Sequence, residues 1–252
     1  MTLANLVPVD LSVPVAPEYP VWPGNPVMTV EGLWTLDEPP YCFNRVVSFD
    51  EHAGTHWDAP SHFVRDPAER GLPLTESVPL ERLIAPACVL DATDLAGSAG
   101  PGESPIYGRD RVLQWEREHR PIEEGNAVLL HTGWTDAHYR TGEAGHLYAQ
   151  AVVDGETAAW PGLDEAAMSL LVERGAGLFG TDTPSAGPLQ VVAEVHRIGL
   201  GAGIVYVENL IGLHQLPATG AWLVFLPLKL VGGSGAPGRA VGLVPREEAQ
   251  IG

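Results

Sequence analysis

A chain of 252 residues with 32 acidic and 14 basic residues has a formal net charge of −18. This balance excludes nucleic acid and anionic membrane surfaces as partners, because both are bound by clustered Lys and Arg. Hydrophobic residues make up 45% and charged residues 18%, which fits a globular protein with a substantial core. The N-terminal segment lacks a basic region and is broken by prolines, so no signal peptide is expected. We expect a cytoplasmic protein whose Cys42 and Cys88 are reduced.

Apolar and β-branched runs alternate along the chain with amphipathic segments. The runs predict buried strands at 87–93, 126–132, 177–182, 203–209 and 222–228. The amphipathic segments predict helices at 107–119, 163–176 and 189–201. In the second helix, Asp164 is the expected N-cap and Gly175 the expected stop. Strands that alternate with helices indicate the α/β class with a mixed sheet.

The organisation of the chain favours one domain over residues 1–252, because no repeat, linker or low-complexity tract divides it. The longest apolar run near the C-terminus, at 220–233, contains a Pro and a Lys and is shorter than the ~20 residues of a membrane span. The weakly periodic segment 139–162 is expected to be an excursion near the surface, of the kind that forms lids or oligomer contacts.

Metal-capable side chains are densest in the stretch DEHAGTHWDAPSHF, which begins at Asp50. His52, His56 and Asp58 have the spacing H-x3-H-x-D. In an extended strand these positions share one face. Imidazole and carboxylate ligands without a thiolate suit Zn²⁺ or Mn²⁺, and they are typical of a catalytic site more than of a structural one.

Two residues that shape the backbone frame this cluster. Gly54 lets the chain fold closely around an ion, and Pro60 cannot continue a central strand, so the chain must turn there. His62 follows the turn and is expected to return toward the ion without binding it. Water on such an ion has its pKa lowered from ~15.7 toward ~7, and a free histidine beside it can move protons.

A second group of candidate ligands lies far downstream. His196 is on a predicted helix, and Glu208 ends an apolar run, where an unpaired carboxylate is costly to bury. Taken alone, His196 could be a histidine on a helix surface and Glu208 an exposed acid at a strand end. Both are explained at once if they complete a metal site with the upstream cluster.

The motif HAGTHWDAPSH, residues 52–62, resembles the HxGTHxDxPxH signature of the metal-dependent cyclase family, which includes bacterial kynurenine formamidase and isatin hydrolase. The resemblance covers nearly the whole chain. Further segments similar to family blocks are PVWPGNP (20–26), GLFGTDTPSAGP (177–188), VENL (207–210) and PLKLVGGSGAPGRAV (227–241). The resemblance implies a swivelling β/β/α domain with a mixed, barrel-like sheet and flanking helices. It also implies a homodimer or homotetramer.

The resemblance assigns roles to the candidate ligands. In the formamidase branch, which holds two zinc ions, His52, His56 and Asp58 would bind the first ion. Asp58 and Glu208 would bridge, and His196 would complete the second ion. In relatives with a single Mn²⁺ the first three residues suffice, so the sequence leaves the number of ions open.

The resemblance also implies which residues act beside the metal. His62 corresponds to the proton donor and acceptor, and Trp22 to an aromatic residue that contacts the substrate. Trp57 and Phe63 are further candidates for an aromatic wall, although each could instead be core packing. Ser185 resembles a serine in a proton path of isatin-hydrolysing relatives, or it is a turn-forming serine.

Asp182 is expected to fix its loop and not to bind metal. Departures from the formamidase branch weaken that specific assignment: the chain has Thr55 where the branch often has Ala, it contains GGSGAP at 232–237, and it is longer around 139–162.

The leading functional hypothesis is a metal-dependent hydrolase acting on a small aromatic or cyclic molecule. Metal-bound hydroxide would attack an amide or ester carbonyl in a lactone, lactam or formamide, and His62 would shuttle the proton to the leaving atom. Two alternatives remain. One is an aromatic polyketide cyclase that uses the same metal for ring formation. The other is a non-catalytic relative that only binds metal.

Overall fold

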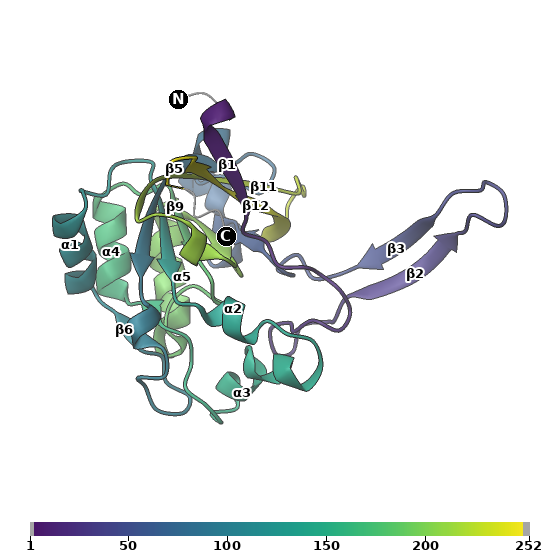
Figure 1. Ribbon diagram of the computed structural model, residues 1–252, viewed down its shortest axis with the longest axis horizontal. Helices are drawn as coiled ribbons and strands as arrows, with labels where there is room; N and C mark the ends of the chain where they lie inside the picture. Colours follow the sequence, from purple (N-terminus) through teal and green to yellow (C-terminus); the bar gives the residue numbers. More distant parts are fainter. Residues whose placement is uncertain (1–2, 249–252) are drawn as a thin grey trace.

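The computed structural model describes residues 3–248, and its centre is a closed, mixed β-barrel of seven strands (Figure 1). The strands around the barrel are β4 (His56–Asp58), β10 (Val205–Glu208), β9 (Leu178–Thr181), β7 (Ala127–His131), β5 (Ile84–Asp91), β11 (Thr219–Pro227) and β12 (Gly235–Pro245). β1 (Leu6–Asp10) extends the sheet beside β12. The mixed sheet predicted from the sequence pattern and the barrel-like form implied by the family resemblance are both confirmed.

The short strand β4 closes the barrel. It pairs antiparallel with β10, where His56 lies opposite Glu208, and antiparallel with β12, where Asp58 lies opposite Gly235. A Cβ atom on Gly235 would lie 2.6 Å from both the His52 ring and the Trp57 carbonyl oxygen. Only glycine therefore lets β12 approach β4 this closely. The pairs β5–β7, β7–β9 and β9–β10 are parallel, whereas β11 pairs antiparallel with both β5 and β12.

Three helices cover the outer face of the parallel strands, as predicted: α1 (Arg109–Glu118), α4 (Glu165–Glu173) and α5 (Val192–Gly201) (Figure 1). The Asp164 side chain accepts a hydrogen bond from the backbone N–H of Ala167, which confirms it as the N-cap of α4. Gly175 follows this helix with a φ of +72°, a left-handed conformation that favours glycine.

Alternation along the strands divides the core into two layers. On β7, Val128 and Leu130 pack under the helices, whereas Leu129 points into the barrel. On β10, Tyr206 faces the helices, and Val205 and Val207 fill the barrel. Strands buried on both faces explain why these segments appear in the sequence as continuous apolar runs.

The segment 139–162 differs from the expected surface excursion. It follows α2 (Trp134–His138), contains α3 (Gln150–Val153), and buries Tyr148 and Trp160 in a third apolar cluster with Val13. Its aromatic side chains make it a packed part of the body. Two short strands, β6 (Ile106–Tyr107) and β8 (Gly162–Leu163), form a separate parallel pair, and β8 begins where the segment ends.

A two-stranded arm, β2 (Thr29–Trp34) and β3 (Asn44–Ser48), projects away from the body (Figure 1). Cys42 lies on this arm and Cys88 in the core; both are free thiols.

Across residues 3–248, no helix is long and apolar enough to span a bilayer.

Candidate metal centre

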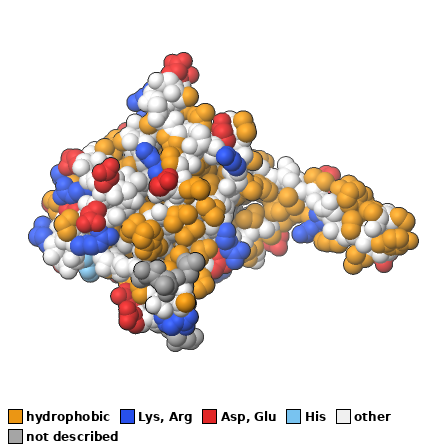
Figure 2. Space-filling model, turned by 90° about the horizontal axis from the view of Figure 1, so that it is seen from above, with side chains coloured by type: hydrophobic (Ala, Val, Ile, Leu, Met, Phe, Trp, Pro, Cys, Tyr) orange, Lys and Arg blue, Asp and Glu red, His pale blue; other side chains and the backbone are white. Residues whose placement is uncertain are grey.

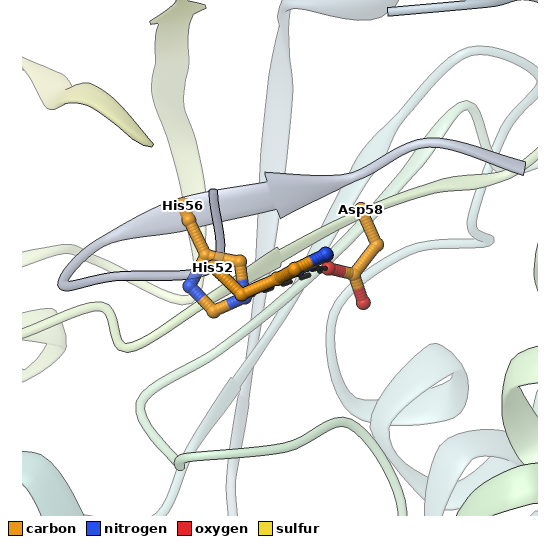
Figure 3. Close-up of side chains that lie close together, drawn as sticks. All are labelled: His52, His56 and Asp58. Carbon is orange, nitrogen blue, oxygen red and sulfur yellow. Dashed lines mark hydrogen bonds and ion pairs between the residues drawn. The ribbon is translucent and has the colours of Figure 1, made fainter. Parts of the chain in front are cut away.

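The strand β4 and the turn before it present the upstream ligands. Strand alternation directs His56 and Asp58 to one face of β4. His52 is not on this strand but in the turn before it, so strand alternation places only His56 and Asp58. Gly54 adopts a φ of +62°, and a Cβ there would lie 2.5 Å from Val15. This turn folds His52 back over β4, where its Nδ1 lies 2.9 Å from Asp58 Oδ1 (Figure 3).

The downstream candidates reach the same place from two neighbouring elements. Glu208 ends β10 beside β4, and its Oε2 lies 3.5 Å from His56 Nε2. His196 projects from α5, with its Nε2 3.2 Å from Glu208 Oε1 and 3.4 Å from Asp58 Oδ2. All five predicted metal ligands therefore meet in one buried cluster.

Asp58 lies at the centre of the cluster. Its carboxylate is fully buried, and Oδ2 accepts no hydrogen bond within the described chain. Two groups of three ligands share it, each with ligand atoms within 4.8 Å of one another: one is His52, His56 and Asp58, and the other is Asp58, His196 and Glu208. A buried carboxylate oxygen without a donor, facing imidazole nitrogens, fits divalent cations held between these side chains.

Each imidazole is oriented by a hydrogen bond on the side away from the cluster. His56 Nδ1 donates to the Gly54 carbonyl at 2.9 Å, and His196 Nδ1 donates to the Val192 carbonyl at 2.7 Å. Both rings then direct Nε2 into the cluster. His52 is reversed, because its Nε2 hydrogen-bonds Ser234 Oγ at 2.9 Å and its Nδ1 faces Asp58. Such partners fix the tautomer that a metal-binding histidine needs.

The charges of the cluster stabilise one another. Burial lowers the pKa of His56 and of His196, but the carboxylates of Asp58 and then Glu208, which lie beside both rings, outweigh this effect and raise each pKa to about 10. Burial raises the pKa of Asp58, yet the imidazoles of His196, His52 and His56 that surround the carboxylate hold it well below its usual range. Without an ion, the carboxylates are therefore paired with protons on the imidazoles.

Metal affinity should consequently increase with pH. A metal ion must displace the protons held on His56 and His196, whose pKa values are about 10. Below that pH, the metal affinity should therefore rise by about tenfold per pH unit for each proton that is displaced. Calorimetric titration of the metal-free protein with Zn²⁺ at pH 6, 7 and 8, in two buffers of different ionisation enthalpy, measures both the affinity and the protons released. A Zn²⁺ affinity that does not change between pH 6 and 8 would contradict ligation of the ion by His56 and His196.

Loss of the hydroxyl at Ser234 should weaken metal binding without unfolding the protein. Ser234→Ala removes the partner that orients His52, and the loss of such a partner typically lowers metal affinity by about 10–100-fold. Competition with a chromophoric chelator measures the change. Ser98→Ala is the matched control, because this exposed serine bonds only the Leu95 carbonyl. Equal affinities in the two variants would show that Ser234 does not orient His52.

A cavity of about 300 Å³ opens onto the cluster, and His62 lies in its wall. His62 ends a short 3-10 helix at Pro60–His62, so the turn predicted at Pro60 is confirmed. Its ring centroid is 4.1 Å from that of His52, and its side chain is exposed to solvent. Partial desolvation lowers the pKa of His62, with Asp58 opposing and His52 reinforcing the shift. A neutral histidine beside the ligands, outside both ligand groups, can accept a proton.

Three of the four predicted substrate contacts line this cavity, namely Trp22, Phe63 and Ser185. Trp22 also packs edge-on against Trp160, with 6.0 Å between ring centroids. The fourth prediction, Trp57, is wrong. Trp57 is fully buried inside the barrel, because it lies between His56 and Asp58 on the strand and must point to the face opposite these two ligands.

The model of the Cyclase family matches residues 9–188 of the chain. The chain belongs to the Cyclase family. Isatin hydrolase of Roseibium aggregatum is 33% identical over 214 residues, which cover 83% of this chain and 78% of that protein. Kynurenine formamidase of Salinibacter ruber is 31% identical over 241 residues, covering 92% and 95%. The structure of isatin hydrolase A from Labrenzia aggregata bound to benzyl benzoate matches with a TM-score of 0.83 at 29% identity, covering 96% and 95%.

In this Cyclase family member, Asn209 and Tyr148 also belong to the site, although sequence reasoning missed both. Asn209 Nδ2 donates to the Gly54 carbonyl at 2.8 Å and lies 3.3 Å from His56 Nδ1. The Tyr148 hydroxyl donates to Asn209 Oδ1, and both residues line the cavity. The only sequence signal was the position of Asn209 directly after Glu208 in VENL.

Asp182 has the role expected of it. Its buried carboxylate accepts hydrogen bonds from the backbone N–H and hydroxyl of Thr132, at 2.8 and 2.6 Å, and from the N–H of Gly133 at 2.7 Å. Burial raises its pKa to about 7. It therefore holds two loops together and lies in neither ligand group that contains Asp58.

Proposed function

We propose that this Cyclase family member is a metal-dependent hydrolase that opens an amide or ester bond in a small cyclic or aromatic substrate. The observation that carries the proposal is the five-ligand cluster around Asp58, which lines a cavity whose wall includes a histidine outside both ligand groups. The names of the curated relatives, isatin hydrolase and kynurenine formamidase, support hydrolysis of C–N bonds.

The donor set supports Zn²⁺ or Mn²⁺, and the two ligand groups that share Asp58 support a centre with two ions. A divalent ion held there supplies a Lewis acid that activates water and polarises the scissile carbonyl. The chain fixes the ligand nitrogens through their outer hydrogen bonds, so little reorganisation is needed when the centre assembles.

Side chains of the cavity then transfer the proton and bind the substrate. His62 accepts a proton during attack and returns it to the leaving nitrogen or oxygen. Trp22 and Phe63 offer apolar faces to a planar substrate, and Ser185 contributes a hydroxyl to the same cavity. Together they orient a flat carbonyl compound over the ligand cluster.

The substrate is expected to be uncharged. Among the described residues, neither Lys nor Arg lines the cavity, so a carboxylate remote from the scissile bond finds no cationic side chain. A neutral cyclic amide or lactone needs no cationic side chain. An amino-acid substrate carries a carboxylate and an ammonium group, and its carboxylate would need one.

The test is ring opening by Zn- or Mn-loaded protein of isatin and a simple aryl lactone, with N-formylkynurenine as the zwitterionic comparison. We expect the neutral cyclic substrates to be opened with kcat/KM at least about tenfold higher than for N-formylkynurenine. Asp58→Asn protein is the inactive control. A metal-loaded sample that hydrolyses none of the three would contradict the proposed hydrolase, and a preference for N-formylkynurenine would contradict the uncharged substrate.

A further inference from the structure

The segment GGSG at 232–235 leads into β12 and passes directly beside His52. Ser234 Oγ lies 2.9 Å from His52 Nε2. A Cβ atom on Gly235 would lie 2.6 Å from Cε1 of the same ring. One loop therefore supplies both the hydrogen-bond partner of His52 and the space that its ring occupies. The position of this loop decides where the ring points.

Glu51, the residue before His52 in the chain, holds this loop. Its Oε2 accepts hydrogen bonds from the backbone N–H groups of Ser234 at 3.0 Å and Gly235 at 3.4 Å. Successive backbone N–H groups that converge on one oxygen form an anion-binding concavity, and a charged acceptor strengthens such bonds. A Cβ atom on Gly233 would lie 2.6 Å from the same oxygen, so only glycine there lets the carboxylate approach.

Other segments attach the loop to the body of the protein. The Gly233 carbonyl accepts hydrogen bonds from the hydroxyls of Thr75 at 2.6 Å and Ser61 at 3.0 Å. The backbone N–H of Gly232 donates to Glu76 at 3.2 Å. These contacts remain when Glu51 is replaced. Loss of its carboxylate should therefore loosen the loop beside His52 without detaching the loop from the body.

Glu51 differs in its setting from most acids of the chain. Figure 2 shows acidic side chains, in red, scattered over the surface that it presents. Glu51 is half-buried, and its Oε2 is occupied by two backbone N–H groups. Among the described residues, it belongs to neither ligand group around Asp58. Its carboxylate therefore binds the loop and not the metal.

We propose that Glu51 is a positioning residue that holds His52 in its ligand group by fixing the loop 232–235. Two adjacent residues of one turn contact Ser234: Glu51 accepts from its backbone N–H, and His52 contacts its hydroxyl. These two contacts fix the ring with Nδ1 directed at Asp58, 2.9 Å from Oδ1. The inference rests on the metal centre of the proposed function, and it does not depend on the substrate.

The two ligand groups make the effect of Glu51 selective. His52 belongs to the group with His56 and Asp58, and it is absent from the group of Asp58, His196 and Glu208. Loss of Glu51 should therefore weaken one of two Zn²⁺ binding steps and leave the other unchanged. A general loss of stability would weaken both steps together.

Calorimetric titration of the metal-free full chain with Zn²⁺ measures both steps. Glu51→Ala should lower the affinity of one step by about 10–100-fold, the usual effect of losing an outer partner of a ligand. Glu51→Gln keeps an uncharged acceptor oxygen, so it should restore most of this loss, to within about tenfold of wild type. Glu69→Ala is the matched control, because Glu69 is an exposed acid on the 3-10 helix Pro67–Arg70, and it should bind Zn²⁺ like wild type.

Amide hydrogen exchange of the metal-free protein, followed by NMR, gives a second readout. The N–H groups of Ser234 and Gly235 lose their acceptor in Glu51→Ala, so they should exchange at least about tenfold faster than in Glu69→Ala. Unchanged exchange in β7 and β9 verifies that the barrel is folded.

Three results would overturn the proposal: an unchanged Zn²⁺ affinity in Glu51→Ala, a fall of both binding steps by the same factor, or equal exchange at Ser234 and Gly235 in Glu51→Ala and Glu69→Ala. A wild-type protein that binds no Zn²⁺ would contradict the proposed function instead. The exchange rates of the metal-free protein would then still decide whether Glu51 holds the loop.

Discussion

Replacing Asp58 with Asn should remove stoichiometric metal while leaving the barrel folded. Asp58 is the one residue common to its two ligand groups, and it is fully buried. Asn keeps the shape of the side chain but removes its negative charge, and with it the anionic oxygen ligand that both groups share. Metal affinity should therefore fall by at least about 100-fold. Elemental analysis after dialysis and calorimetric titration with Zn²⁺ measure the loss, and turnover should fall with metal content.

Two measurements separate this effect from misfolding. Asp94→Asn is the matched control, because Asp94 is exposed and pairs with Arg111 at the surface, so metal content should not change. In the metal-free state, Asp58→Asn also removes the strongest partner of His56 and His196, so their pKa values should fall from about 10, which NMR titration can detect. Unchanged Zn²⁺ affinity in Asp58→Asn would exclude a centre built on this carboxylate.

The fold was predictable where strands are buried on both faces. Segments such as 126–132 and 203–209 carry continuous apolar runs because helices cover one face and the barrel interior the other. β12, at Gly235–Pro245, was not predicted, since its Gly and Pro residues disfavour a strand locally. Its pairing with β1, β4 and β11 supplies that structure. The aromatic cluster of 139–162 likewise depends on distant contacts, which leave no periodic pattern.

In the site, too, residues on one strand could be predicted from the sequence, whereas residues that act through contacts distant in the sequence could not. His56 and Asp58 follow from spacing, because alternation along β4 places both on one face. The same alternation excludes Trp57 from the cavity, and applying it strictly to the sequence would have corrected that prediction. Ser234 and Asn209 act only through hydrogen bonds to ligand histidines or to the turn at Gly54. Single polar residues in loops carry no pattern that reveals such partners.

Replacing His62 with Ala should lower turnover by about 10²–10⁴-fold, the usual contribution of a positioned proton-transfer group. Zn²⁺ affinity should stay within about threefold of wild type, because His62 belongs to neither ligand group around Asp58. Steady-state kinetics on whichever substrate the protein opens, together with Zn²⁺ titration, measure the two quantities. His119→Ala is the matched control, since His119 is an exposed histidine that belongs to no candidate ligand group among the described residues.

The pH profile distinguishes proton transfer from a structural role. Desolvation lowers the pKa of His62, so the ring is neutral at pH 7 and can accept a proton. As pH falls through that lowered pKa, the ring becomes protonated and wild-type turnover should decrease. His62→Ala should lose this acidic limb, and added imidazole should restore part of the rate. Turnover preserved in His62→Ala would refute the assigned role, and Zn²⁺ lost together with turnover would make His62 a ligand.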